Sequence, residues 1–413
     1  MQNLDMPDAG APSPAGLRTG ALTGLRVVDL TSVVFGAYAT QILGDLGADV
    51  IKIESPHGMR GAGGDTMRWA GRTPSDAAAG LGPIFMATNR NKRSALIDLA
   101  SAEGRGMLHA LVAEADLFVT TVRAPALERI GADRAALTAL KPDLIYLHGT
   151  GFASDGPDAG KPVYDDLIQA RCGLADLLSR MDGDATPRFL PSLLGDKVAG
   201  LFLAQAALAG LAHKLRTGEG QFIEVPMLEC LTSFNLLEHQ FGHVFDPPLG
   251  PMGYPRITSS ERRPYPTRDG FVCILPYTDA HWRRFFEACG VESSVRDDPR
   301  FADYRTRQAH ASALHALVSS LTAEQPTQYW IDLLESMEIP VARINRLEDL
   351  QADPQLVGGG FFQRLRHPQA GDYIATRPPI RFEKSPCALR LHPPLLGEHT
   401  AEVSGEARIS KTR

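Results

Sequence analysis

Cysteine is scarce in this chain of 413 residues. The five cysteines are Cys172, Cys230, Cys273, Cys289 and Cys387. No two of them form a C-x-x-C pair, so neither a disulfide framework nor a cysteine-based zinc site is indicated. The twelve histidines show no H-E-x-x-H or comparable spacing. We therefore expect no bound metal, and free thiols in a reducing cytoplasm.

The chain also lacks an excess of positive charge and a long apolar run. It has 42 Lys and Arg against 48 Asp and Glu, a net charge of −6, so nucleic acid is not an expected partner. The most apolar stretch, residues 198–212, is shorter than the roughly 20 residues that a spanning helix needs, so no membrane contact is expected either. Residues 1–20 have no apolar segment typical of a signal peptide, and they are predicted to be a disordered tail.

What the sequence does contain is an alternation of short apolar runs with helical patterns. Strands are predicted at 25–30, 50–54, 95–99, 117–121, 144–148 and 221–225, with helices at 37–46, 102–113, 135–140 and 198–216. This alternation favours an α/β domain with a largely parallel sheet. Residues 247–266 are rich in Pro and Gly and are followed by one strand and several helices, which indicates a smaller α+β domain. The predicted division is therefore a large domain at 21–225, a linker helix and small domain at 226–335, and a return to the large domain at 336–413.

The first strand–helix unit does not fit a dinucleotide site. Glu54 ends the second strand, where a ribose-binding acid would lie. However, no G-x-G-x-x-G follows the first strand, and those glycines are what allow a pyrophosphate to approach the backbone. The glycines at 358–360 lack a strand–helix context and are interpreted as a flexible connection.

Three polar motifs leave two interpretations each open. Gly195-Asp196 precedes the longest helix, so Asp196 is either an N-cap or a carboxylate kept ionised at a helix N-terminus. The acids of Tyr164-Asp165-Asp166 are either catalytic or part of a solvated helix start. The basic turn NRNKRS (89–94) either holds phosphates or is a surface charge cluster.

A series of motifs resembles the class III coenzyme A transferases, the CaiB/BaiF family. They run in the family's order along nearly the whole chain, from residue 22 to 403. The motifs are LTGLRVVDLTSVVFGAYATQILGDLGADVIKIESP (22–56), NRNKRSALIDL (89–99), KPDLIYLHGTGF (141–152), YDDLIQARCGL (164–174), Gly195-Asp196, RTGEGQFIEVPMLE (216–229) and PPLLGEHT (393–400).

This resemblance implies both an architecture and a chemistry. The architecture is a Rossmann-like large domain plus a small domain, in a homodimer whose two chains are interlocked. The chemistry is CoA transfer between carboxylic acids, with Asp196 as the nucleophile that carries CoA as an aspartyl thioester. CoA and the acids are substrates, and no added cofactor is implied.

The family also suggests the supporting residues. Tyr164, Asp165, Val34 and Gly195 would support the active site. Residues expected to contact CoA are Arg129, Lys92, Arg93, Ile97, Thr121 and Val122.

Three positions depart from individual members of the family. Val34 stands where a formate/oxalate transferase has Gln, and Ser55 where it has a CoA-contacting Arg, so formate/oxalate specificity is not expected. The apolar Val34 points to a less polar or bulkier acid. Tyr164 stands where the related 2-methylacyl-CoA racemases have the His that exchanges the α-proton, and a phenol is a poor base at neutral pH. CoA transfer is thus the leading hypothesis, with a racemase and a non-catalytic acyl-CoA-binding relative as the alternatives.

Overall fold

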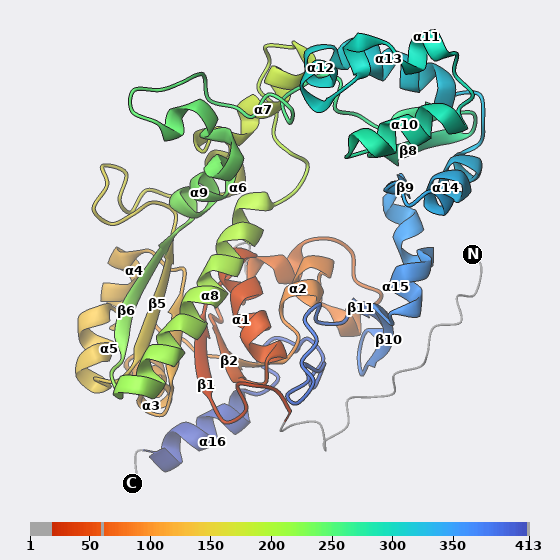
Figure 1. Ribbon diagram of the computed structural model, residues 1–413. Helices are drawn as coiled ribbons and strands as arrows, with labels where there is room; N and C mark the ends of the chain where they lie inside the picture. The colour runs from red at the N-terminus through yellow and green to blue at the C-terminus, as the bar shows by residue number, and fades with distance from the viewer. Residues whose placement is uncertain (1–18, 59–61, 411–413) are drawn as a thin grey trace. The chain divides into compact units, whose positions relative to one another are not determined.

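The computed structural model describes residues 19–58 and 62–410, and it divides the chain into two compact units (Figure 1). The large unit contains residues up to 175 together with 189–235 and 354–413, and the small unit contains 176–188 and 236–353. The predicted tail at 1–20 lies almost entirely outside the described residues.

A six-stranded parallel sheet forms the centre of the large unit. Its strand order is β3-β2-β1-β4-β5-β6, in which the chain moves outward from β1 to one edge and then returns to build the other half. The strands are β1 (Arg26–Leu30), β2 (Asp49–Glu54), β3 (Lys92–Leu96), β4 (Leu117–Thr120), β5 (Ile145–Thr150) and β6 (Gln221–Pro226). The predicted α/β class with a parallel sheet is confirmed.

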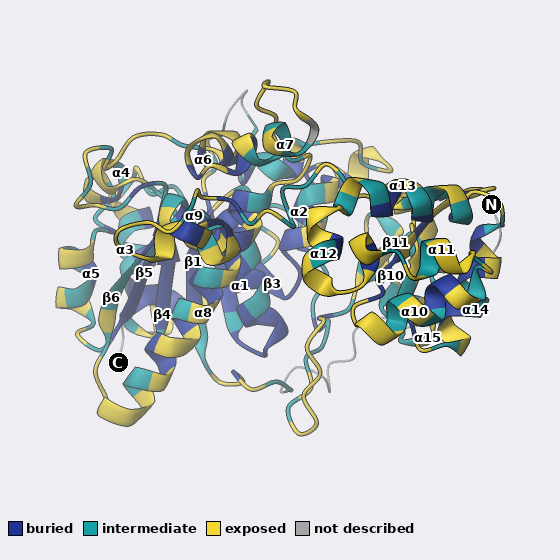
Figure 2. Ribbon diagram, turned by 45° about the horizontal axis from the view of Figure 1, so that its top comes forward, coloured by how far each residue is buried: buried dark blue, intermediate teal, exposed yellow. Residues whose placement is uncertain are grey.

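Helices cover both faces of this sheet. On one face, α8 (Leu194–Thr217) contacts β5, β6 and α1 (Phe35–Asp45). On the other, α3 (Ala102–Ala113) contacts α5 (Arg134–Leu140) and α16 (Thr400–Ser410). Side chains alternate along a strand, so each strand contributes to both layers, and the strands lie among the most buried segments (Figure 2).

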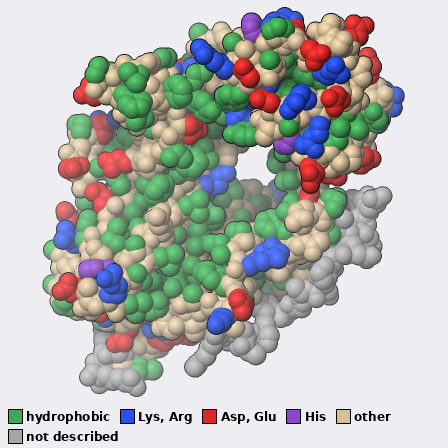
Figure 3. Space-filling view, in the orientation of Figure 1, with side chains coloured by type: hydrophobic (Ala, Val, Ile, Leu, Met, Phe, Trp, Pro, Cys, Tyr) green, Lys and Arg blue, Asp and Glu red, His purple; other side chains and the backbone are tan. Residues whose placement is uncertain are grey.

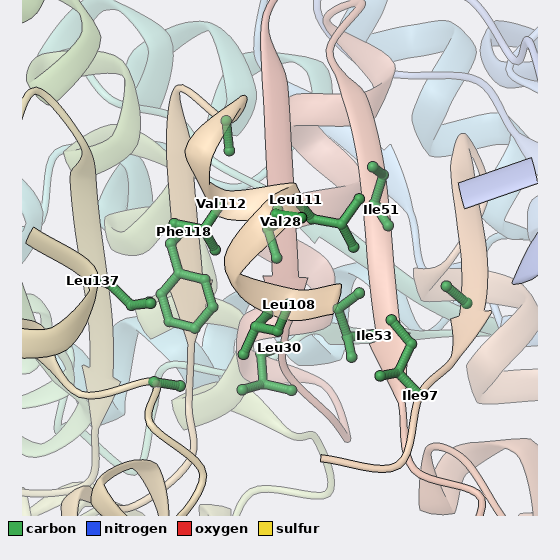
Figure 4. Packing of buried hydrophobic residues seen from close by; sticks show 14 of the residues in the cluster. Val28, Leu30, Ile51, Ile53, Ile97, Leu108, Leu111, Val112, Phe118 and Leu137 are labelled. Carbon is green, nitrogen blue, oxygen red and sulfur yellow. The ribbon is translucent and has the colours of Figure 1, made fainter. Parts of the chain in front are cut away.

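The core beneath α3 follows from the strand register. Val28 of β1 is paired with Ile51 of β2 and with Phe118 of β4, so three apolar side chains lie in one row on the same face. Leu108 and Leu111 of α3 pack on this face (Figure 4), and all five side chains are at most 1% exposed. Burial of this size supplies the main stabilisation of the unit.

The remaining elements of the large unit are mostly short. They are η3 (Thr66–Trp69), η4 (Asp76–Ala78), α2 (Pro83–Thr88), α4 (Ala124–Arg129), α6 (Asp165–Arg171), α15 (Pro354–Gly358), β10 (Phe362–His367) and β11 (Gly371–Thr376). Helices α7 (Leu174–Asp182) and α9 (Met227–His239) each run from this unit into the small one.

The returning C-terminal segment is fixed to the large unit by buried polar contacts. Arg390 donates to the carbonyl oxygens of Gly44 and Ala48 at the end of α1, at 2.6 and 2.9 Å. Arg68 donates to the carbonyl of Pro394 at 2.9 Å. These contacts join residues more than 300 positions apart in the sequence.

The small unit has its own sheet and core. Its antiparallel strands are β7 (Tyr265–Thr267), β8 (Gly270–Ile274) and β9 (Val341–Arg343). Its helices are η5 (Phe241–Val244), α10 (Asp279–Ala288), α11 (Ser293–Arg296), η6 (Pro299–Phe301), α12 (Tyr304–Ala309), α13 (Ala311–Thr322), α14 (Thr327–Ser336) and η7 (Leu347–Ala352). Phe285, Phe286 and Trp330 are prominent in its core.

The observed division differs from the predicted boundaries at 225/226 and 335/336. The strand at 341–343, assigned from the sequence to the large domain, pairs with β8 instead, so the chain returns to the large unit only at Pro354. Most of α9 likewise remains in the large unit, up to Asn235. The sequence predicted these elements, but it did not show which unit each one packs in.

Candidate active site

A cavity of about 870 Å³ opens at the carboxyl ends of the central strands. This is where parallel α/β sheets usually bind ligands. Ser32, Val33 and Phe35 line it beyond β1, Thr121 beyond β4, and Glu224 comes from β6. Further lining residues include Arg123, Arg134, His148, Phe152, Lys161, Val163, Tyr164, Asp196 and Phe222.

Asp196 brings a buried carboxylic acid into this cavity. It is the third residue of α8 and only 8% exposed. The N-cap of α8 is Leu193, which makes no side-chain capping bond, so the N-cap interpretation of Asp196 is wrong. Its own backbone N–H donates to Oδ1 of Asp165 over 2.9 Å. The group that satisfies this first-turn N–H of α8 therefore comes from another helix, α6.

The surroundings of Asp196 disfavour its charged form. Burial, and secondarily the charge of Asp165, raise the pKa of Asp196 to about 6, while a backbone hydrogen bond from Phe35 acts in the opposite direction. At neutral pH the carboxylate is still ionised, but it has lost most of the water that would otherwise stabilise it. A poorly solvated carboxylate in an apolar-walled cavity is suited to attack an electrophilic carbonyl carbon.

Two glycines of α8 allow this close arrangement. A Cβ on Gly195 would lie 3.1 Å from Oδ1 of Asp165, and a Cβ on Gly200 would lie 2.9 Å from the carbonyl oxygen of Phe35. Gly200 is one turn after Asp196 and therefore on the same side of α8. Both glycines thus allow the helix carrying Asp196 to approach the groups that position and surround its carboxylate.

Gln169 was not singled out from the sequence, although it supports the same arrangement. Its Nε2 donates to Oδ2 of Asp165 at 2.6 Å and to the carbonyl of Ser192 at 3.0 Å, while its Oε1 accepts from the N–H of Leu190 at 2.9 Å. It ties Asp165 to the segment that leads into α8. Its position one helical turn after Asp165 is the signal that could have indicated it.

The first loop is strained at the cavity wall. Val33 has a φ of +67°, a left-handed conformation that costs a β-branched residue roughly 1–3 kcal/mol. Val34, the residue predicted to support the site, is only 5% exposed and is the N-cap of α1, whereas its neighbours Val33 and Phe35 line the cavity. The inference of a bulkier acid from Val34 therefore loses its structural basis.

Of the other predicted support residues, Asp165 contacts Asp196 and Tyr164 lines the same cavity. Tyr164 lines the cavity, is 69% exposed and precedes α6 as its N-cap. Asp165 is 4% exposed, which contradicts the interpretation of this acid as part of a solvated helix start. Asp166, the next residue, is exposed.

The basic turn at 89–94 does not reach the cavity. Lys92 is completely buried, and its Nζ donates to Asn89 Oδ1 at 2.8 Å, to the Ala37 carbonyl at 2.9 Å and to Asp29 at 3.1 Å. Arg93 forms ion pairs with Asp49 and with Glu402 and Glu406 of α16. For these two residues, the interpretation as phosphate ligands and the interpretation as a surface charge cluster are both wrong. Lys92 joins β3 to α1, and Arg93 joins β3 to the C-terminal helix.

The remaining predicted CoA contacts divide by position. Thr121 lines the cavity, whereas Ile97 is 3% exposed in the core under α3, and Val122 packs against that core. Neither Ile97 nor Val122 is among the lining residues. Arg129 is exposed at the end of α4, a helix whose earlier residues do line the cavity, and its contact with CoA stays a prediction.

Other cations, which the sequence did not single out, do line the cavity. Arg134 has its guanidinium carbon 4.7 Å from the ring centre of Phe222, and Lys161 is ion-paired with Asp158. Arg123 has no ion-pair partner among the described residues. The acids Glu128, Asp133 and Glu224 line the cavity as well, so the cations lie in a wall of mixed charge.

By length and composition, α8 is the one helix in the described part of the chain that could cross a membrane. Core helices of soluble proteins meet the same criteria, and 44% of the apolar window of α8 is buried inside the structure. Within the described ranges, no group of three His, Cys, Asp or Glu side chains could hold a metal ion.

The large unit is therefore a parallel α/β fold in which a buried carboxylic acid is among the residues that line a large cavity. The CoA-transferase family III pattern matches residues 22–400, and the chain belongs to this family.

Relatives cover nearly the whole chain. A succinate–glutarate CoA-transferase of Agrobacterium fabrum is 31% identical over 97% of both chains. A succinyl-CoA:mesaconate CoA-transferase of Haloarcula hispanica is 31% identical over 94% of this chain and 97% of its own. The crystal structure of a CaiB/BaiF family protein from Brucella suis, 30% identical, superimposes with a TM-score of 0.79 over 94% of this chain and 100% of that one. The predicted family is therefore confirmed.

Proposed function

We propose that this protein transfers CoA from an acyl-CoA to a free carboxylic acid through a thioester on Asp196. The observation that carries the proposal is the position of Asp196, a buried carboxylic acid with a pKa raised to about 6 in a cavity of about 870 Å³. Membership of CoA-transferase family III supports the same reaction.

The first half-reaction loads the enzyme. The carboxylate of Asp196 attacks the thioester carbonyl of the donor, the C–S bond breaks, and CoA leaves as a thiolate from a mixed anhydride. The thiolate then attacks the Asp196 carbonyl of that anhydride, and the donor acid leaves as a carboxylate. Asp196 now holds CoA as a thioester.

The second half-reaction repeats these steps in reverse order with a new acid. The acceptor carboxylate attacks the Asp196 thioester and releases CoA thiolate, which then attacks the acceptor's carbonyl. Asp196 is regenerated as a carboxylate. No net proton, water or ATP is consumed. Because water would hydrolyse the anhydride and the thioester, the cavity must exclude it during the reaction.

The surrounding residues have separate tasks in this scheme. Asp165 accepts the Asp196 N–H and fixes the start of α8, and Gln169 holds Asp165. The backbone hydrogen bond from Phe35 orients the attacking carboxylate. Because these donors and acceptors are fixed by packing, little reorganisation is needed when the nucleophile attacks.

We infer that at least one of the exchanged acids is a dicarboxylate. The relatives above are named for succinate, glutarate and mesaconate, and an acid with two carboxylates keeps one negative charge when the other is esterified to CoA. Arg123, Arg134 and Lys161 line the same cavity as Asp196. Glu128, Asp133 and Glu224 line the cavity too, so the selectivity would come from a direct contact of one of these cations with the second carboxylate, which an acid with an apolar tail cannot make.

We also propose a homodimer, in which the two chains interlock as the family resemblance implies. Leu201, Leu208 and Leu215 on α8 are 52%, 39% and 80% exposed. Their seven-residue spacing puts them on one side of the helix. Figure 3 shows hydrophobic side chains gathered on the face along which α8 runs. A second copy that covers this face would remove a large apolar area from water.

The experiment is a CoA-transfer assay by mass spectrometry, with succinyl-CoA as donor and a panel of mono- and dicarboxylic acids as acceptors. Asp196→Asn is the test variant. Asp166→Asn is the matched control, because Asp166 is an exposed residue in the first turn of α6. We expect no transfer by Asp196→Asn and wild-type transfer by the control. Near-normal transfer by Asp196→Asn would overturn the proposed mechanism.

A further inference from the structure

A buried ion pair between Lys52 and Asp65 contacts the loop between β1 and α1. Oδ1 of Asp65 accepts hydrogen bonds from the backbone N–H groups of Val33 and Met67, both at 3.0 Å. Nζ of Lys52 lies 3.0 Å from Oδ2 of Asp65 and donates to the carbonyl of Thr31 at 2.9 Å. The pair therefore holds both neighbours of Ser32, a residue of the cavity wall.

Both members of this pair are completely buried, with side chains 0% exposed. Burial alone would lower the pKa of Lys52, but the carboxylates of Asp65, Asp29 and Glu54 raise it above its ordinary value. The surrounding carboxylates therefore favour the charged form of the ammonium. Asp65 is fixed in turn, because its N–H donates to Oε1 of Glu54 at 3.0 Å.

The held loop leads directly to the nucleophile. Val33 keeps the left-handed conformation that its side chain disfavours. Two residues later Phe35 lines the same cavity as Asp196, and its backbone lowers the pKa of that carboxyl. Without an external hold, a Val at this position would relax to an ordinary negative φ, which would turn the peptide groups that follow it.

We propose that Asp65, together with Lys52, is a positioning residue for CoA transfer: it holds Val33 in its left-handed conformation so that the N–H of Phe35 faces the carboxylate of Asp196. The inference rests on the proposed function of Asp196. Neither Asp65 nor Lys52 lines the cavity, so both act only through the loop.

The test compares two substitutions of Asp65 with a matched control. Asp65→Ala removes the acceptor of the Val33 N–H, whereas Asp65→Asn keeps an oxygen acceptor and loses only the charge. Asp45→Ala is the control, because Asp45 forms a mostly buried pair with Arg90 at 2.7 Å, with side chains 7% and 9% exposed, at the far end of α1. All three variants lose a buried ion pair, but only the Asp65 variants affect the loop.

We expect Asp65→Ala to lower kcat about 10- to 100-fold, as a displacement of about 1 Å does, with KM for acyl-CoA changed less than about twofold. Asp65→Asn should recover much of this loss. Asp45→Ala should reduce thermal stability and leave kcat unchanged. Equal kcat losses for Asp65→Ala and Asp65→Asn, or kcat for Asp65→Ala no lower than for Asp45→Ala, would overturn the proposal.

A second readout follows the nucleophile itself. The rate at which hydroxylamine traps the Asp196 thioester, measured by peptide mass spectrometry across pH, should fall in Asp65→Ala, and its acid limb should move to higher pH. Asp165 contacts Asp196, and the other titratable or charged groups that line the cavity are Arg123, Glu128, Asp133, Arg134, His148, Lys161, Tyr164 and Glu224. None of them is altered in the variants. No trapping in the wild-type enzyme would refute the proposed function, whereas equal trapping in both enzymes would refute only the positioning role.

If Asp65→Ala does not fold, Val33→Gly supplies an independent test, because glycine adopts a positive φ without strain. Asp65→Asn should then lower kcat less in a Val33→Gly background than in the wild-type background. Equal losses in the two backgrounds would overturn the proposal.

Discussion

The backbone N–H of Asp196 donates to the carboxylate of Asp165 over 2.9 Å, so two acidic residues share one buried place at the start of α8. Asp165 supplies the acceptor that a helix N-terminus requires, and its negative charge also helps to keep the pKa of Asp196 high. One contact thus fixes the position of the nucleophile and weakens the solvation of its charge.

The raised pKa of Asp196 predicts an acid limb in the activity profile. Because the ionised carboxylate is the nucleophile, kcat should fall as the pH drops through about 6. The measurement is kcat for CoA transfer between pH 5 and 8 in buffers of constant ionic strength. An acid limb near pH 4, where an ordinary aspartate titrates, would contradict the raised pKa of Asp196 and its burial as the cause.

The same pKa predicts that Asp196 reduces stability at neutral pH. Its pKa is higher in the folded than in the unfolded chain, so above about pH 6 the folded protein carries the full cost of the buried charge, and below about pH 4 it carries none. Asp196→Asn should therefore raise the free energy of unfolding at pH 7.5, by up to roughly 2–3 kcal/mol, and change it little at pH 4. Urea unfolding at both pH values measures this, and a pH-independent difference would refute it.

Gly195 should not tolerate a side chain. The added Cβ of Gly195→Ala would lie 3.1 Å from Oδ1 of Asp165, so the carboxylate must move and the bond to the Asp196 N–H must lengthen. We expect kcat to fall at least about tenfold, with KM for acyl-CoA changed less. Gly405→Ala in α16 is the control, since a Cβ there meets nothing within 4 Å, and it should be neutral or slightly stabilising. Wild-type kcat for Gly195→Ala would show that the Asp165 contact is dispensable.

Arg123 should contribute to recognition of a second carboxylate. It lines the cavity and has no ion-pair partner among the described residues, so Arg123→Gln should raise KM for a dicarboxylate acceptor several-fold and leave KM for a monocarboxylate of similar length nearly unchanged. Arg216→Gln, on the exposed last turn of α8, controls for the loss of one positive charge. Equal effects on both classes of acid would place Arg123 on CoA instead of on the acid.

The exposed leucines of α8 predict the oligomeric state. Leu208→Glu puts a charge in the middle of the apolar stripe and should weaken a dimer that buries this face, as measured by light scattering at micromolar concentration. Leu347, 83% exposed in the small unit, supplies the control Leu347→Glu. A wild-type protein that is monomeric at this concentration would contradict the homodimer.

Local pattern in the sequence was sufficient for most strands of the central sheet, for its long covering helices and for the α/β class. It misplaced the third strand, predicted at 95–99 and observed at Lys92–Leu96, and it did not indicate β10 and β11. Apolar runs such as 25–30 and 117–121 are short and follow helical segments, and a chain of that kind can bury its strands only in a parallel sheet covered by helices. Asp196 was singled out as the nucleophile candidate by the family resemblance of the motifs, since the Gly195-Asp196 pair by itself left an N-cap and a functional carboxylate both open.

The partners of charged residues were decided only by the tertiary structure. Lys92 and Arg93 look like phosphate ligands in the sequence, yet Lys92 is enclosed by Asp29 and Asn89, and Arg93 meets Glu402 and Glu406 more than 300 positions away. A sequence shows which side chains carry charge, but whether that charge faces a ligand or a buried partner depends on which segments the fold brings together. For the same reason, only the structure shows that Asp65 holds Val33 and that Asp165 holds Asp196, since each contact joins residues about 30 positions apart.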